Sequence, residues 1–296
     1  MGVNAGDAIT SGYENAIFGQ GAGGSLTDGH DNVIIGASAG TTTTSVGQAV
    51  IIGDFAGGSG NITDAADGVV LIGGGAGRYL TTGAGNLAIG YAAMLRHTTG
   101  VRNIAIGYGA MDDTDAGGGT WADAASNYNV GIGNNVMDSA LNGVEYTTAV
   151  GHGALSAVTS GVNNSVFGTQ AGTAITTGAY NVAIGTQAML THTTGRNNIA
   201  IGSGVMDDTN AGSNSLDSDH NVFIGVDSGG GTWADAKSEF NVAVGNYTLN
   251  GALNGALHNT ALGYQALLAL TEGDANTVIG YQSGDSITTS GYNSLL

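Results

Sequence analysis

A five-residue phrase recurs along the whole chain and constrains the fold more than any other feature. It reads Asn, any residue, a small apolar residue, a larger apolar residue and Gly, as at 103–107, 181–185 and 198–202. Its last residue, called the closing glycine below, usually recurs 17 residues later, as from Gly90 to Gly107. A fixed short period over an entire chain is the signature of a solenoid. We therefore predict a single repeat array over residues 1–296, a parallel β-solenoid of about 15 coils.

Counting close variants, the closing glycines are Gly19, Gly36, Gly53, Gly73, Gly90, Gly107, Gly133, Gly151, Gly168, Gly185, Gly202, Gly225, Gly245, Gly263 and Gly280.

Residues 86–102 illustrate one coil. The segments 86–90 and 91–95 are short and apolar, which predicts two short strands, and Gly100 ends a return turn at a position that suits positive φ. Successive coils then pair as parallel strands. The Asn that opens each phrase can hydrogen-bond along such a stack, with ligand binding as its alternative role. We predict a structural ladder that includes Asn103, Asn181 and Asn198, together with the closing glycines Gly107, Gly185 and Gly202.

The phrase also predicts self-association. Adjacent residues of a strand point to opposite faces, yet segments such as 33–35 and 69–72 are apolar on both. One face fills the coil, and the other would leave an apolar stripe that is too large to stay in water. We expect parallel copies of the chain to cover that stripe as a homotrimer. The alternative is a broad single solenoid that encloses both faces.

We further expect the small residue three places after each closing glycine to let the backbones of neighbouring copies approach closely. These residues are Ala22, Ala39, Ala56, Ala76, Ala93, Ala110, Ala154, Ala171, Ala188 and Ala266.

Composition removes several classes of partner. The 23 acidic and 5 basic residues give a net charge of −18, which argues against nucleic acids and anionic membranes as partners. The absence of Cys excludes disulfides and thiolate metal sites. No apolar run approaches membrane-spanning length, so we predict no membrane insertion. The glycines recur beside Val, Ile and Leu, which argues against a disordered Gly-rich chain.

The repeat resembles known fibre proteins. The segments Asn-Ser-Val-Phe-Gly at 164–168 and Asn-Thr-Ala-Leu-Gly-Tyr-Gln-Ala-Leu at 259–267 are similar to the head repeats of trimeric autotransporter adhesins. They resemble even more the Gly-Tyr-Gln-Ala-Leu repeats of bacteriophage tail-fibre proteins. The resemblance covers nearly the whole chain and implies a left-handed β-roll of three chains, on an extracellular or virion-borne fibre. Adhesin head coils are slightly shorter, and a coiled-coil stalk, a membrane anchor and a chaperone domain are not recognised here.

Blocks of coils are themselves duplicated. The block 97–116 matches 192–211 at an offset of 95, and 117–124 matches 229–236 at an offset of 112. The segment 285–293 also echoes 7–15. The array therefore reads as though its end continues into its own beginning. We expect either end-to-end stacking into a filament or a segment of a longer fibre.

The candidate binding residues lie in insertions, which in solenoids often gather on the binding face. A Trp on such a loop can stack on a sugar ring while Asp side chains accept hydrogen bonds from its hydroxyls, and the alternative is that the Trp covers exposed coil edges. The candidates for binding cell-surface carbohydrate are Trp121, Trp233, Asp112, Asp113, Asp207 and Asp208.

Two further readings concern metal ions and aromatic residues. The acidic turns 112–115 and 207–210 could hold Ca²⁺ through oxygen ligands, but they lack EF-hand or calcium-repeat spacing, so we favour solvated loops and predict no cofactor. Tyr91, Tyr108, Tyr264 and Tyr281 directly follow closing glycines. They form either an exposed aromatic row or a coil-to-coil stack.

No recognised catalytic constellation is present, so we predict a protein that is not an enzyme. The six His residues lie at unlike positions, without a Gly-x-Ser-x-Gly elbow or a His-Glu-x-x-His run. Depolymerase activity and ice binding are weaker alternatives. Ice binding is disfavoured because it requires Thr at alternate strand positions, whereas these Thr are adjacent and sit in bends. We predict a structural and adhesive fibre module located outside cells or on a virion. The alternative is an extracellular filament subunit that stacks end to end.

Overall fold

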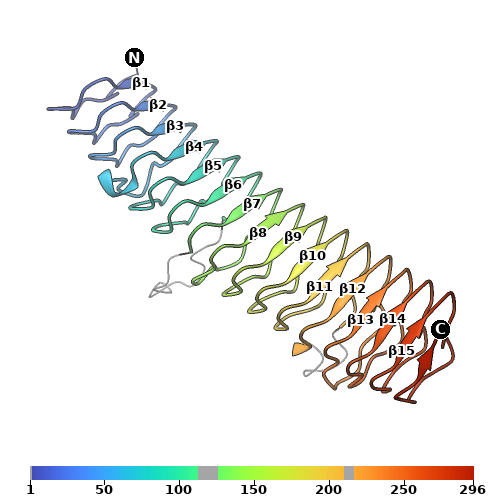
Figure 1. Ribbon diagram of the computed structural model, residues 1–296. Coiled ribbons are helices and arrows are strands. Elements are labelled where there is room, and N and C mark those ends of the chain that lie inside the picture. Colours follow the sequence, from blue (N-terminus) through green and yellow to red (C-terminus); the bar gives the residue numbers. More distant parts are fainter. Residues whose placement is uncertain (1, 113–125, 210–216) are drawn as a thin grey trace. The chain divides into compact units, whose positions relative to one another are not determined.

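The computed structural model describes residues 2–112, 126–209 and 217–296. These residues form sixteen short parallel strands and one 3₁₀ helix, so the predicted all-β solenoid of about 15 coils is confirmed. The chain gathers into two compact units, residues 1–147 and 148–296, and each is described by itself. Within each unit, every strand pairs in parallel with the strand of the next coil (Figure 1).

The first unit holds seven strands and the 3₁₀ helix in its described residues: β1 (Ala16–Phe18), β2 (Val33–Ile35), β3 (Val50–Ile52), η1 (Asp64–Ala66), β4 (Val70–Ile72), β5 (Leu87–Ile89), β6 (Ile104–Ile106) and β7 (Val130–Ile132). The second unit holds nine strands in its described residues: β8 (Thr148–Val150), β9 (Ser165–Phe167), β10 (Val182–Ile184), β11 (Ile199–Ile201), β12 (Val222–Ile224), β13 (Val242–Val244), β14 (Thr260–Leu262), β15 (Thr277–Ile279) and β16 (Ser294–Leu295).

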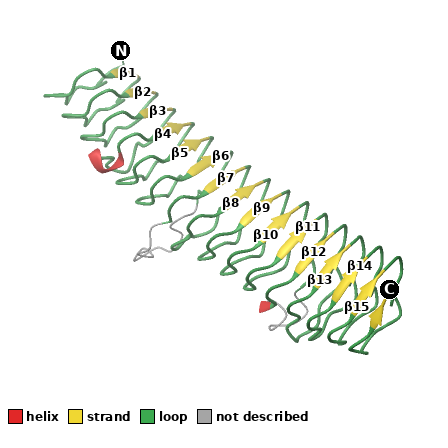
Figure 2. Cartoon of the chain, in the orientation of Figure 1, coloured by secondary structure: helices red, strands yellow, loops and turns green. Residues whose placement is uncertain are grey.

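Each coil contains one strand rather than the two that the sequence predicts. The segment 91–95 is a turn, because Ala92 and Met94 adopt φ values of 57° and 52°, which are incompatible with an extended strand. Their N–H groups bond to opposite neighbours: Ala92 to the Gly74 carbonyl of one coil, and Met94 to the Ala110 carbonyl of the next. Backbone hydrogen bonds therefore stack the coils on the turn side as well as on the strand side. Figure 2 shows the strands along one side of the coils, with turns and loops elsewhere.

The interior is filled by two sets of small or apolar residues. The middle residue of each strand from β2 to β15 is buried, as are the alanines three places after the closing glycines. The prediction that these alanines let the backbones of neighbouring copies approach closely is therefore wrong. Ala93 and Ala188, for example, have no exposed surface and lie inside their own coils.

Candidate functional site

The asparagine ladder runs through the interior of both units. The backbone N–H of Asn198 donates to Asn181 Oδ1 at 3.0 Å, and Asn103 N–H donates to Asn86 Oδ1 at 2.8 Å. Each amide nitrogen also donates to a turn carbonyl of the following coil, as Asn181 Nδ2 does to the Gly195 oxygen at 2.8 Å. All these side chains are buried, so their roles are structural and leave no amide free for a ligand.

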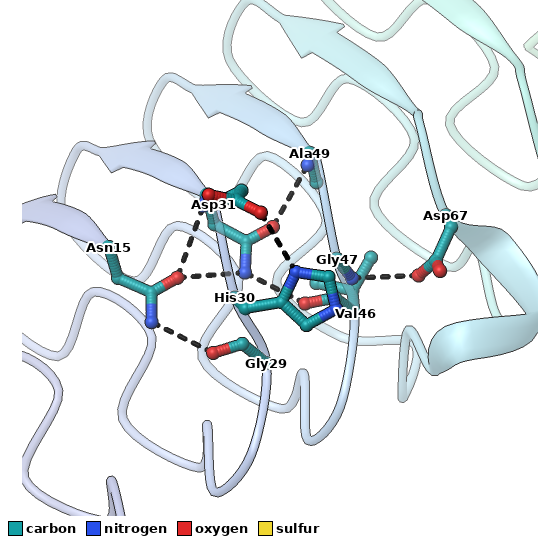
Figure 3. Close-up of polar contacts among 9 residues, drawn as sticks. Asn15, Gly29, His30, Asp31, Val46, Gly47, Ala49 and Asp67 are labelled. Atoms are coloured by element: carbon teal, nitrogen blue, oxygen red, sulfur yellow. Dashed lines mark hydrogen bonds and ion pairs between the residues drawn. The ribbon is translucent and has the colours of Figure 1, made fainter. Parts of the chain in front are cut away.

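Figure 3 shows the ladder near its first coils. Asn15 Nδ2 donates to the Gly29 carbonyl at 2.8 Å, and its Oδ1 accepts from the backbone N–H of Asn32. Asn32 Oδ1 in turn accepts from the N–H of Ala49 at 2.9 Å. Because Ala49 has no side-chain amide, the relay of side chains is interrupted there and resumes at Asn86. Beside the ladder, Asp67 accepts a hydrogen bond from the Gly47 N–H at 2.7 Å.

The closing glycines make the coils stack closely. Gly107, Gly185 and Gly202 have φ between 134° and 139°. A β-carbon at any of them would overlap the carbonyl oxygen of the closing glycine in the next coil. Both the backbone conformation and the missing side chain are therefore required at these positions.

The first and third residues of each strand form an outward strand face. In β2 to β15 they are half-buried or exposed while the middle residue is buried. The exposed members include Phe18, Ile35, Ile132, Phe167, Ile184, Val242, Leu262 and Ile279. Across β1 to β16 none of the first or third strand residues is charged, although the chain carries a net charge of −18. Such a continuous uncharged face is unusual for a surface that stays in water.

The aromatic residues after the closing glycines are both exposed and stacked. Tyr91 and Tyr108 lie with ring centroids 5.6 Å apart and planes 12° apart, and Tyr264 and Tyr281 pair at 5.5 Å and 9°. One face of each ring covers its partner in the neighbouring coil, while Tyr91 and Tyr281 remain 63% and 72% exposed. These pairs therefore support neighbouring coils and also present aromatic surface to solvent.

Trp233 does not present its ring to solvent. It is fully buried, its indole N–H donates to the Gly229 carbonyl at 2.9 Å, and its ring packs on Phe223 at 5.8 Å. A buried indole offers no face to a glycan, so the carbohydrate-stacking prediction for Trp233 is wrong. Its alternative, that the ring packs against the coil, agrees with these contacts. Trp121 and Asp113 lie outside the described residues.

The other predicted acidic residues have different surroundings. The Asp208 carboxylate accepts a hydrogen bond from the Thr232 hydroxyl, and its carbonyl accepts from the Trp233 N–H at 2.9 Å. Asp112 lies in the first unit, where its carbonyl accepts from the Arg96 N–H at 3.1 Å. Asp207 is half-buried. Burial, with the nearby charges of Asp227 and Asp208, raises the pKa of Asp207 to about 6.

Sequence reasoning missed two buried histidines that contact the ladder. His192 Nε2 lies 3.2 Å from Asn198 Nδ2, and its Nδ1 lies 3.3 Å from the Thr209 hydroxyl. His97 Nε2 lies 3.3 Å from Asn103 Nδ2 and 3.1 Å from the Gly100 carbonyl. Burial lowers the pKa of both, that of His192 to about 4. The sequence feature that could have revealed these histidines is that they stand at corresponding positions of the duplicated blocks.

The described residues contain neither a cluster of metal-ligating side chains nor a membrane-spanning helix. No group of three or more His, Cys, Asp or Glu side chains there is placed to hold a metal ion. Likewise, none of the helices among these residues has the length and apolar character needed to cross a bilayer.

Comparison of the chain with protein-family models, with curated proteins and with solved structures finds no match in any of the three.

Proposed function

We propose that this chain is a structural module of an extracellular or virion-borne fibre, in which three copies pack through their outward strand faces. The observation that carries the proposal is the absence of charge from that face in a chain of net charge −18. Interfaces between permanent subunits are depleted of charge at their centres, and the acidic remainder of the surface keeps the assembly soluble. The interior ladder supplies stiffness, which suits a shaft.

A second copy of the chain is the occupant that best fits this face. The large exposed side chains of this face are Ile, Leu, Val and Phe, accompanied by the smaller exposed Thr260 and Thr277. An identical face presents the same uncharged chemistry. Phe18 and Leu262, for instance, are 54% and 45% exposed in the single chain. Carbohydrate binding is not part of this proposal, because Trp233 is buried. A role for Trp121 in binding sugars stays a prediction.

Charge placed on the outward strand face tests the proposal. Ile184 is 38% exposed in β10, and a lysine there would have to be buried without a partner if three copies pack through this face. We expect Ile184→Lys to dissociate the assembly into single chains in sedimentation velocity experiments. The matched control is Thr177→Lys, at an exposed turn position of the same coil, which should leave the mass unchanged. Equal masses for both variants would contradict the proposal.

End-to-end stacking is the second candidate function. β1 and β16 each pair with one strand only among the described residues, through β2 and β15 respectively, so each has an edge open to another chain. Segment 285–293 also echoes 7–15. Rods of unlimited length in electron micrographs, growing with protein concentration, would support the filament. Particles of one fixed length would favour the three-chain module.

A further inference from the structure

Three residues of the second unit occupy the same place in successive coils. Asp207, Gly230 and Asn250 each lie five residues after a closing glycine, at 202, 225 and 245. The middle coil therefore has no side chain where its neighbours carry a carboxylate and an amide. A β-carbon at Gly230 would lie 3.0 Å from the Gly204 carbonyl oxygen, 3.1 Å from Asn250 Oδ1 and 3.2 Å from Asp207 Oδ1. Three oxygens from the two flanking coils, two of them from the coil of Gly204 and Asp207, thus converge on the place of the missing side chain.

Two of these oxygens have no partner. Asp207 Oδ1 and Asn250 Oδ1 are both shielded from solvent, and neither accepts a hydrogen bond. Leaving a buried acceptor unsatisfied costs about 1–3 kcal/mol, and more when the group is charged. Two such acceptors that face one point are a strong sign that a positively charged or hydrogen-donating species belongs between them.

The carboxylate of Asp227 lies close to that of Asp207, near Gly204. A β-carbon at Gly204 would overlap Asp227 Oδ1 and would lie 3.4 Å from Asp207 Oδ2, so the two carboxylates approach the same backbone point. Their mutual repulsion contributes to the raised pKa of Asp207, although burial contributes more. A bound cation would remove both costs, whereas a bound water molecule would remove neither the charge nor the repulsion.

We propose that a Ca²⁺ ion binds between these coils, with the side-chain oxygens of Asp207, Asp227 and Asn250 and the carbonyl oxygen of Gly204 as its protein ligands. The set contains only oxygen, as hard divalent cations require, and it mixes carboxylate, amide and backbone donors as Ca²⁺ sites commonly do. Ligands on separate coils form a cage of adjustable width, which suits Ca²⁺ better than Mg²⁺ with its strict octahedral geometry. The ion would tie together three coils.

The duplicated block in the first unit offers a natural comparison. The corresponding residues there are Asp112 and Asp138, five places after Gly107 and Gly133. Asp138 corresponds to Gly230 and carries a side chain where Gly230 has none. Both Asp112 and Asp138 have interaction partners. Asp112 and Asp138 therefore do not repeat, among the described residues of the first unit, the pair of unsatisfied oxygens that defines the proposed site.

Calorimetric titration of the chelator-treated full chain with CaCl₂ tests the proposal. We expect one site that Asp207→Asn and Asp227→Asn each weaken at least tenfold, whereas Asp112→Asn leaves its affinity unchanged. Asn250→Asp adds a carboxylate and should tighten binding several-fold, an effect that misfolding cannot mimic. Saturating Ca²⁺ should also raise the melting temperature of the parent chain and not that of Asp207→Asn.

The absence of a titratable site in the parent chain would overturn the proposal. It would mean that a proton on Asp207, or a rotated Asn250 amide, satisfies the two oxygens. Equal weakening by Asp112→Asn and Asp207→Asn would also overturn it, because binding would then follow the overall negative charge rather than this group of residues.

Discussion

Two duplicated blocks, 97–112 and 192–207, share most of their sequence but lie in different surroundings. Both begin with a buried His, continue through a ladder Asn and end in Met-Asp. The differences come from the coil that follows. In the first unit the middle of β7 is Gly131, whose missing side chain is replaced by Met111, with Cγ 3.2 Å from the position of a β-carbon. In the second unit the middle of β12 is Phe223.

The large Phe223 side chain is accommodated by another missing side chain. A β-carbon at Gly229 would lie 2.8 Å from the Phe223 ring, whereas the first unit has the buried Met137 at the corresponding place. The solenoid thus keeps its backbone and exchanges volume between two interior positions of the same coil. The comparison shows that the packing inside a coil is determined by this pairing of a large with a small residue. The five-residue phrase alone does not determine it.

The largest expected effect comes from breaking this pairing in the second unit. Phe223→Ala should lower the free energy of unfolding by about 3–5 kcal/mol, because it leaves a cavity beside Trp233. The double variant Phe223→Ala with Gly229→Met reproduces the Ala and Met found at 200 and 206 and should recover much of the loss. Chemical denaturation measures both. An equal loss in the single and double variants would refute the exchange of volume.

The next effect concerns the buried histidines and pH. His192 has a folded-state pKa of about 4 against about 6.5 when unfolded, so its stabilisation is complete above pH 6.5 and is lost as the pH falls towards 4. The loss amounts to about 3 kcal/mol over that range. Burial is the main reason for the low pKa of His192, and the structure gives a second one. The Asn198 amide nitrogen faces His192 Nε2, so a proton on Nε2 would place two hydrogen-bond donors against each other.

Denaturation at several pH values, with His192→Gln as the comparison, measures this effect. Because the pKa of Asp207 is raised, its protonation favours the folded state as the pH falls below 6 and opposes the effect of His192. The three chains compared, the parent, His192→Gln and His97→Gln, should therefore all carry Asp207→Asn. We expect His192→Gln to lose part of the pH dependence between 6.5 and 4. His97→Gln should change less, since a hydrogen bond from His97 Nε2 to the Gly100 carbonyl counteracts the lowering of the His97 pKa by burial. Parallel pH profiles for all three chains would contradict this account.

The smallest effect tests the outer surface of the two blocks. Tyr108 of the first block stacks on Tyr91, whereas the second block has Ser203 at the corresponding place. Tyr108→Ser should cost only about 0.5–1.5 kcal/mol, because the ring is already more than half exposed. Thermal denaturation followed by circular dichroism is sufficient to detect it. A cost as large as that of Phe223→Ala would mean that the stack is part of a buried interface.

The sequence predicts the coil period and the asparagine ladder because both depend on local spacing. Asn103, Asn181 and Asn198 recur in register, and parallel pairing brings equal positions together. The expected second strand at 91–95 fails for a local reason that hydrophobicity does not reveal: Ala92 and Met94 have positive φ. Apolar content alone cannot distinguish such a turn from a strand.

The sequence draws attention to the acidic turn 207–210 but not to Asp227 or Asn250, because the proposed cation site depends on register across coils of unequal length. Asp207 and Asn250 face each other only after Gly230 is placed between them, and the relevant coils are longer than the period. Likewise, whether Trp233 is exposed or buried depends on the Gly229 and Phe223 pairing. These features belong to packing between coils, which the repeat phrase does not encode.

The measurement that tests the central claim most directly is the mass of the parent chain in solution, by light scattering on the eluate of a size-exclusion column. One chain has a mass of 29.0 kDa. Packing of three copies through the outward strand face predicts a single species of three times that mass, unchanged on dilution over the micromolar range. A mass of one chain would leave that face in water and would contradict the proposed assembly.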